Sequence, residues 1–177
     1  GTVINPVDTC RLEQQYNVTF GSTLSLSNGI VYRTPPTSSA NSFRLFFVEG
    51  ILTLTDMVLH GGNVLDYMQC HCYANFPGPN CVGGLILVKN PQDDAGVCAN
   101  SKNPQDDQAR GVLTTLRTTM YGGKASQGAA IYVTGRCAKV TLTDSIVRDN
   151  EACWEGGGMF VDSPASDITI FGTCGLQ

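Results

Sequence analysis

Two stretches that lie 28 residues apart decide the fold of this chain: QGAAIYV at residues 127–133 and EGGGMFV at residues 155–161. Each runs from three small residues into a short apolar segment. The same offset relates VTLT at residues 140–143 to ITIF at residues 168–171. A fixed internal period predicts a repeat architecture, in which each repeat is one structural unit that packs on its neighbours.

Earlier copies of the repeat are separated by insertions. GGLILV at residues 83–88 and FRLFFV at residues 43–48 end in the same apolar segment. The second segment recurs as TLTDMVL at residues 53–59 and, more weakly, as TTLRTTM at residues 114–120. The first segments align at four valines: Val48, Val88, Val133 and Val161. A unit this short, with strand-like segments and turn-forming Gly and Asn, favours a parallel β-solenoid over leucine-rich or βαβ repeats.

We therefore predict an all-β fold, a right-handed parallel β-helix of about four to five coils, in a single domain over residues 1–177. Residues 1–18 are predicted to form an N-terminal cap or a strand donated to a neighbour, because the open end of a solenoid invites pairing. The spacing of the aligned valines exceeds the 28-residue period twice, which places cysteine-bearing insertions at residues 64–82 and 89–110.

The small-residue segments resemble the motifs of a known group of proteins. Gly128–Ile131 and Gly156–Met159 look like the GGA-I motif of right-handed β-helix repeats, and Val147–Asn150 looks like the companion FxxN motif with Val in place of Phe. Both motifs are typical of chlamydial polymorphic outer-membrane proteins and of many algal surface proteins. The resemblance covers roughly residues 45–174. It implies the β-helix fold and, from the chlamydial members, an adhesin or autotransporter passenger function.

Cysteine content indicates an extracellular or cell-surface protein. An even count of cysteines on a Gly-rich, polar chain predicts disulfide bonds formed in an oxidising compartment. The eight cysteines are Cys10, Cys70, Cys72, Cys81, Cys98, Cys137, Cys153 and Cys174. The tripeptide Asn17-Val18-Thr19 is an N-glycosylation sequon, which fits the same compartment. Since the chain begins at Gly1 without an initiator Met or signal peptide, we expect a mature product or a piece of a longer chain.

Composition and charge exclude two classes of partner. Charged residues make up only 15% of the chain and its net charge is −4, so the basic stripe that nucleic acid requires is missing. Nothing approaches the run of about 18 apolar residues that crosses a membrane. We expect a protein that binds no nucleic acid and does not span a membrane.

The aligned apolar strands have two apolar faces. Because alternate side chains of a strand point to opposite sides, only one set of positions can line the interior. The other set points outward, where either the insertions cover it or it forms an exposed stripe of the kind that marks a partner surface. We predict an assembly face formed by Leu45, Phe47, Leu85, Leu87, Tyr132 and Phe160.

No pattern specifies a metal, a cofactor or a catalytic centre. NPQDD occurs at residues 90–94 and again at 103–107, and its carboxylates could bind Ca²⁺. The spacings of EF-hand and RTX loops are missing, so solvated turns are the preferred interpretation. Cys70-His71-Cys72 with Cys81 has a poor spacing for zinc, and disulfides are favoured there.

The repeats also argue against two further functions, catalysis and ice binding. Polysaccharide-active β-helices use several acids at matching coil positions or a Ca²⁺-bound substrate with a basic residue, and the repeats offer neither. His60, next to a repeat corner, is interpreted as a capping or surface residue. The Thr-x-Thr pairs at Thr53 and Thr141 are interrupted by intervening repeats, which argues against a flat ice-binding array.

These features favour an extracellular structural glycoprotein that assembles into a filament, sheath or surface coat. Its partners would be copies of itself or other extracellular structural proteins. The alternative is an adhesin-type binding module for a glycan or a protein, and the third hypothesis is a lyase-like or hydrolase-like polysaccharide enzyme. We expect the chain not to be an enzyme and to need no cofactor.

Overall fold

The computed structural model describes residues 2–4, 9–33, 42–65, 81–91, 111–163, 166–172 and 175–176. Within these ranges the regular secondary structure is entirely β, and the strands pair in parallel across three sheets. The fold is therefore all-β with stacked parallel sheets, which is consistent with a β-helix-like solenoid. The part of the chain described here contains no helix that is long and apolar enough to cross a membrane.

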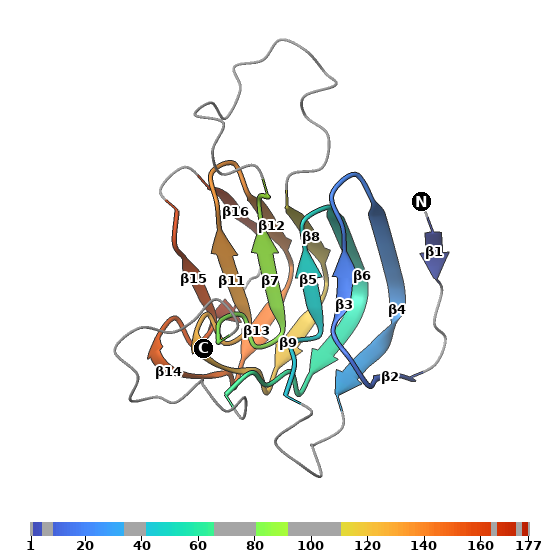
Figure 1. The fold of residues 1–177 in the computed structure, drawn as a ribbon. Helices are drawn as coiled ribbons and strands as arrows, with labels where there is room; N and C mark the ends of the chain where they lie inside the picture. Colours follow the sequence, from blue (N-terminus) through green and yellow to red (C-terminus); the bar gives the residue numbers. More distant parts are fainter. Residues whose placement is uncertain are drawn as a thin grey trace.

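In each sheet, strands from successive repeats lie side by side. The five-stranded sheet comprises β3 (Tyr16–Val18), β5 (Phe46–Val48), β7 (Ile86–Lys89), β11 (Ile131–Thr134) and β15 (Met159–Val161). The two-stranded sheet comprises β10 (Lys124–Gln127) and β14 (Glu151–Glu155). The ten-stranded sheet comprises β1 (Thr2–Ile4), β2 (Thr9–Leu12), β4 (Thr23–Arg33), β6 (Ile51–His60), β8 (Val112–Leu116), β9 (Thr119–Tyr121), β12 (Lys139–Thr143), β13 (Ile146–Arg148), β16 (Asp167–Phe171) and β17 (Gly175–Leu176). Figure 1 shows the five-stranded sheet standing in front of the strands β6, β8, β12 and β16.

The register of the five-stranded sheet is the one that the repeat predicts. Val48 pairs with Val88, Val88 with Val133, and Val133 with Val161. The second segment follows the same rule, because Val140 pairs with Ile168 at the 28-residue offset. The alignment therefore holds on both sides of the two segments that were predicted as insertions. Most of 64–82 and 89–110 lies outside the described residues.

A bend divides the ten-stranded sheet into two halves at one position of every repeat. This position has a positive φ each time, a left-handed conformation that Gly, Asn and Asp tolerate best. The stacked bend residues are Asn28, Asp56, Arg117, Asp144 and Gly172. In β4 and β6 the strand continues through the bend, whereas in later repeats it ends there and a new strand begins. In the two TLTD segments, at residues 53–56 and 141–144, the Asp is therefore the bend residue.

The core lies between the five-stranded sheet and both halves of the ten-stranded sheet, and Leu59, Met120 and Val147 belong to it from beyond the bend. Side chains at the same repeat position stack on one another, as Leu24, Leu52 and Leu113 do in the ten-stranded sheet. Phe46, Ile86 and Ile131 stack in the same way from the opposite side. Burial of these apolar columns, at roughly 25 cal/mol per Å², is the main favourable term that holds successive repeats together.

The FxxN-like segment has a defined structural role at a second corner. The side chain of Asn150 accepts the backbone N–H of Gly123 at 2.8 Å and donates to the carbonyl of Met120 at 3.2 Å. It also donates to the carbonyl of Arg148 in its own repeat at 2.8 Å. One amide therefore ties two successive repeats together and satisfies backbone groups that the turn would otherwise leave unpaired.

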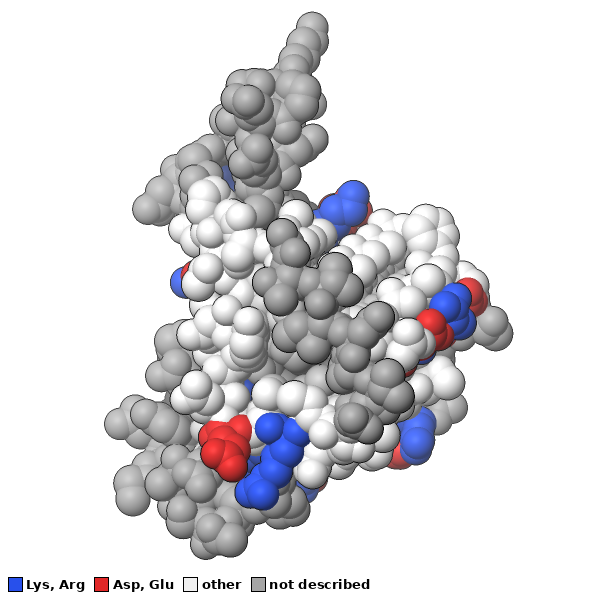
Figure 2. Space-filling view, turned by 90° about the vertical axis from the view of Figure 1, so that its right-hand side faces the viewer, with Lys and Arg blue, Asp and Glu red and all other residues white. Residues whose placement is uncertain are grey.

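The N-terminal residues extend the chain's own sheets. β1 and β2 both pair in parallel with β4, and β3 pairs with β5. Figure 2 views the molecule from the side on which β1 and β4 lie in Figure 1. Basic side chains on this face lie beside acidic ones in small groups. Among the described ion pairs, Arg117 with Asp56 and Lys139 with Asp167 have nitrogen–oxygen distances of 2.6 and 3.4 Å.

Candidate functional site

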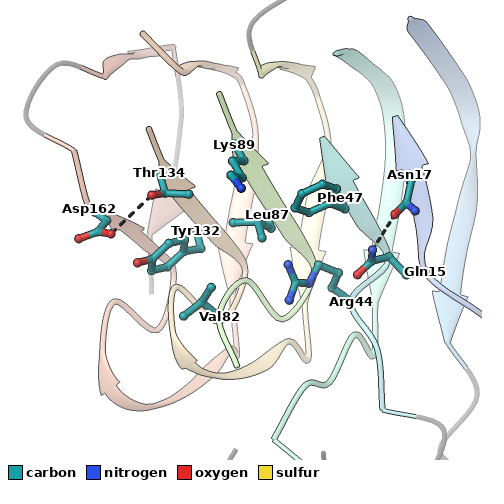
Figure 3. Close-up of a pocket in the computed structure, with 10 residues that line it drawn as sticks. All are labelled: Gln15, Asn17, Arg44, Phe47, Val82, Leu87, Lys89, Tyr132, Thr134 and Asp162. Atoms are coloured by element: carbon teal, nitrogen blue, oxygen red, sulfur yellow. Dashed lines mark hydrogen bonds between the residues drawn. The ribbon is translucent and has the colours of Figure 1, made fainter. Parts of the chain in front are cut away.

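A groove runs along the outer face of the five-stranded sheet, where strands β3, β5, β7 and β11 lie side by side (Figure 3). Its volume is about 620 Å³, within the range of ordinary ligand sites. The residues that line it are Gln15, Asn17, Arg44, Phe47, Val82, Leu87, Lys89, Tyr132, Thr134 and Asp162. They come from five successive repeats, and the parallel register brings them into three rows.

The middle row forms an apolar floor. Phe47, Leu87 and Tyr132 occupy one outward column, because the flanking positions of each strand point into the core. Phe160 continues the column, with its ring 5.6 Å from that of Tyr132 and nearly parallel to it. Leu87 and Tyr132 are only 4% and 7% exposed, because these side chains pack on one another and on Val82. The predicted outward stripe thus lines a groove.

Two residues of the predicted assembly face belong to the interior instead. Leu45 and Leu85 are fully buried and join the main core. Each precedes its strand, in the bend where the backbone amides of Leu45 and Phe46 both donate to the carbonyl of Leu85. Side-chain alternation begins only with the strand, so two consecutive residues point inward at this bend. The placement of Leu45 and Leu85 on an outer face was therefore wrong.

Arg44 brings a positive charge to one wall of the groove. Its guanidinium carbon lies 5.9 Å from the ring centroid of Phe47, in a cation–π geometry, and the residue is only 5% exposed. Burial lowers the pKa of Arg44 to about 10, so the side chain stays cationic at neutral pH. Figure 3 shows the guanidinium directed over the floor toward Leu87.

The opposite wall carries the remaining charges. Lys89 on β7 pairs in register with Thr134 on β11, and the hydroxyl of Thr134 lies 3.5 Å from a carboxylate oxygen of Asp162. Burial, together with a hydrogen bond to Asp162 and the charge of that carboxylate, raises the pKa of Tyr132. The phenol of Tyr132 is therefore protonated across the physiological range and serves as a hydrogen-bond donor.

The N-terminal end of the groove is formed by two amides. The side-chain nitrogen of Gln15 donates to the side-chain oxygen of Asn17 at 2.6 Å. Asn17 pairs in register with Phe47, so it occupies the first place of the outward column on the edge strand β3. A flat apolar floor between amides, hydroxyls, two cations and a carboxylate suits a ligand with apolar faces and many hydroxyl groups.

The cysteines divide into three groups. Cys81, Cys137 and Cys153 are disulfide-bonded, whereas Cys70, Cys72, Cys98 and Cys174 lie outside the described residues. Cys10 is a free, exposed thiol on β2, so the prediction that it forms a disulfide was wrong. Its strand partner is Val31, and it therefore faces an apolar side chain of the neighbouring repeat. Cys153 lies within β14.

The two candidate metal sites named from the sequence lie almost entirely outside the described residues. Of the NPQDD segments at 90–94 and 103–107, only Asn90 and Pro91 are described, and Cys70-His71-Cys72 is not described. The described part of the chain contains no cluster of three or more His, Cys, Asp or Glu side chains that could hold a metal ion.

His60 lies among aromatic residues of the neighbouring repeats. Its ring is stacked between those of Tyr32 and Tyr121, with centroid distances of 5.3 and 5.1 Å. The guanidinium of Arg148 lies over the far side of Tyr121 at 5.1 Å. Partial burial lowers the pKa of His60, so the imidazole is neutral at neutral pH. It is part of a ladder of rings across three repeats. Of the two expected roles, capping or surface residue, its partial exposure agrees with the surface residue.

The threonine array is continuous, contrary to the sequence-based interpretation. Five hydroxyl residues pair in register across the ten-stranded sheet: Ser25, Thr53, Thr114, Thr141 and Thr169. Because the predicted insertion at 89–110 separates Thr114 from the preceding repeat, the sequence alone does not show that Thr114 aligns with Thr53. The columns on both sides are mixed, with Val112 and Leu116 beside Thr114, so the hydroxyl array is a single column wide.

Comparison of the chain with protein-family models, with curated proteins and with solved structures gave no match. The functional argument therefore rests on the geometry of the groove.

Proposed function

We propose that this chain is an extracellular binding module that holds an extended glycan in the groove of the five-stranded sheet. We also propose that its stacked repeats form a right-handed parallel β-helix of about four to five coils, as in the surface proteins whose motifs it resembles. One observation carries the functional proposal. The apolar row of Phe47, Leu87 and Tyr132 lies in one groove between charged and amide side chains.

The apolar floor and the polar walls of the groove match the chemistry of a sugar. Pyranose rings have an apolar C–H face that packs on aromatic and aliphatic side chains, and a rim of hydroxyl groups that needs donors and acceptors. Arg44 and Lys89 add positive charge in a partly desolvated site, where electrostatic attraction is stronger than in water. The ligand class that uses all of these groups is an acidic oligosaccharide that carries carboxylates.

The disulfides and the sequon support an extracellular location. Cys81, Cys137 and Cys153 are bonded, and disulfides persist mainly in oxidising compartments. Asn17 of the sequon is exposed on β3, where a glycan-transferring enzyme would need it.

Neutralising Lys89 is expected to weaken glycan binding. We predict that Lys89→Gln lowers the affinity for an oligogalacturonate by on the order of tenfold, because a charge-assisted hydrogen bond contributes about 1.5–3 kcal/mol. Binding of a neutral cello-oligosaccharide should be weaker from the start and change little. Titration calorimetry measures both, and release of reducing ends or unsaturated products in the same samples tests the expectation that the chain is not an enzyme.

The matched control is Lys139→Gln, which removes a lysine from the ten-stranded sheet, where it pairs with Asp167. Its affinity for the oligogalacturonate should equal that of the unchanged chain. Equal affinities for the Lys89→Gln and Lys139→Gln variants, or no binding of either glycan by the chain that carries no glycan on Asn17, would contradict the proposed function.

Self-assembly is the second candidate, and the C-terminal end of the stack favours it. Val161 is 39% exposed, whereas Val48, Val88 and Val133 in the same column are fully buried. Ile170 is 43% exposed, although its partner Leu142 is fully buried. Positions that face the core in other repeats are thus open to solvent in the last described one. A second copy of the chain could cover them end to end.

The self-assembly candidate predicts association that depends on this end. Sedimentation velocity over a range of concentrations should show larger species for the unchanged chain, and Ile170→Lys should abolish them because a charge on an apolar contact is strongly unfavourable. Thr169→Lys, a neighbouring change whose side chain points to the opposite side of the same strand, is the matched control and should still associate. A chain that stays monomeric at high concentration would count against assembly.

A further inference from the structure

The single N-glycosylation sequon of the chain lies at the N-terminal end of the groove. Asn17 lines the groove and is the first member of the outward column that continues with Phe47 and Leu87. It lies on β3, which is the edge strand of the five-stranded sheet. Since neighbouring strands of a sheet are about 4.8 Å apart, a group attached to Asn17 begins directly beside the ring of Phe47.

The atom that would carry a glycan is available. In the bond between the two amides, Gln15 donates and the side-chain oxygen Oδ1 of Asn17 accepts, at 2.6 Å (Figure 3). That bond does not use the side-chain nitrogen Nδ2 of Asn17. Asn17 and Thr19 are both exposed, so the acceptor amide and the hydroxyl that completes the sequon face solvent.

We propose that an N-linked glycan on Asn17 lies along the floor of the groove and excludes other glycans from it. Nδ2 attacks the anomeric carbon of an oligosaccharide that is linked to a lipid pyrophosphate. The new C–N bond forms as the bond between that carbon and the pyrophosphate oxygen breaks, Nδ2 loses one proton, and the lipid pyrophosphate leaves. The inference that a ligand is excluded rests on the proposed function, whereas the position of the attached glycan does not.

The direction of the attached glycan follows from the surfaces around Asn17. The residues that line the groove all lie on the side of Asn17 that faces the sheet, since β3 is the edge strand. Toward β5 and β7 it meets the ring of Phe47, the guanidinium of Arg44 and the amide of Gln15. An N-acetylhexosamine has an apolar face for the ring and an amide and hydroxyls for the polar groups. Since the attachment is covalent, its effective concentration at the groove is high, and weak contacts suffice to keep it there.

The occupied groove can be detected without any free ligand. The whole chain is produced in a glycosylating eukaryotic host, in three forms: unchanged, Thr19→Ser and Thr19→Ala. Thr19→Ser preserves the sequon and Thr19→Ala destroys it, while both keep Asn17 itself. Reductive methylation followed by peptide mass spectrometry then measures the reaction rate of Lys89 in the groove and of Lys139 on the ten-stranded sheet.

We expect Lys89 to react several-fold more slowly in the two glycosylated forms than in Thr19→Ala, because the glycan excludes the reagent. Lys139 should react at one rate in all three forms, which shows that the fold is unchanged. Absence of a glycan on Asn17 in the secreted chain, or an equal rate for Lys89 with and without it, would overturn the inference.

Binding of oligogalacturonate by the same three forms separates this inference from the proposed function. Thr19→Ala should bind on the order of tenfold more tightly than the glycosylated forms. If Lys89 is shielded but no form binds the oligosaccharide, the proposed function fails and the position of the glycan stands. If all forms bind it equally and Lys89 is not shielded, the proposed function stands and the glycan does not occupy the groove.

Discussion

Replacing Leu142 with Ala is expected to lower the free energy of unfolding by about 3 kcal/mol, within the range of about 2–5 kcal/mol for a buried leucine. Leu142 is fully buried in the main core, and its strand β12 is flanked on both sides by β8 and β16. The neighbouring repeats cannot close the cavity without breaking this pairing, so most of the cost remains. Denaturant unfolding followed by circular dichroism measures the loss.

The matched control for Leu142→Ala is Ile170→Ala, the same position one repeat later. Ile170 pairs with Leu142 but is 43% exposed, so its truncation leaves no cavity and should cost less than about 1 kcal/mol. If Ile170→Ala lowered the free energy of unfolding as much as Leu142→Ala, the expectation would be wrong, and Ile170 would be buried in solution.

Replacing Gly62 with Ala is expected to destabilise the chain by about 3 kcal/mol through overpacking between two backbones. A Cβ at Gly62 would lie 2.0 Å from the carbonyl oxygen of Gly84 and 3.0 Å from the Cα of Leu85. Both contacts are backbone atoms of the next repeat, so no side chain can rotate away. The carbonyl of Gly62 also accepts the backbone N–H of Lys124 at 2.9 Å, and separating the repeats would strain that bond. Thermal unfolding measures the loss.

Gly21→Ala is the reverse case, a conformational cost without overpacking, since Gly62 itself is not left-handed. Gly21 has a φ of +76°, and a Cβ there would meet nothing within 4 Å. Its replacement therefore costs only the left-handed conformation, about 1–2 kcal/mol for a residue with a Cβ. A smaller loss for Gly62→Ala than for Gly21→Ala would contradict the close packing of the two repeats.

Much of the fold was predictable because the repeat fixes the register. The four aligned valines pair as expected, since an apolar column that must stay in the core leaves no freedom to shift by one residue. The copy at residues 114–120 is weak in sequence because Thr115 occupies the place of Leu54 and Leu142. The structure compensates with a buried hydrogen bond of 2.9 Å between the hydroxyls of Thr115 and Ser145.

The groove was only half predictable. Its floor follows from alternation within strands, which identified Phe47, Leu87 and Tyr132 correctly as outward residues. Two wall residues, Lys89 and Thr134, end their strands and follow the same alternation. Arg44 and Asp162 lie before and after the strands, where no period of two applies. The same limit explains the error at Leu45 and Leu85. Side-chain direction in a bend depends on backbone angles that the sequence pattern does not contain.

The parallel register also determines how the molecule responds to force. In every pair of strands the backbone hydrogen bonds run from one repeat to the next, along the direction of stacking. Tension along that direction loads the interfaces between repeats in series, so the repeats should detach one after another from an open end. Tension along the strands loads all bonds of an interface at once, and rupture then requires a much larger force. A module of this kind is mechanically strong across its stack and weak along it.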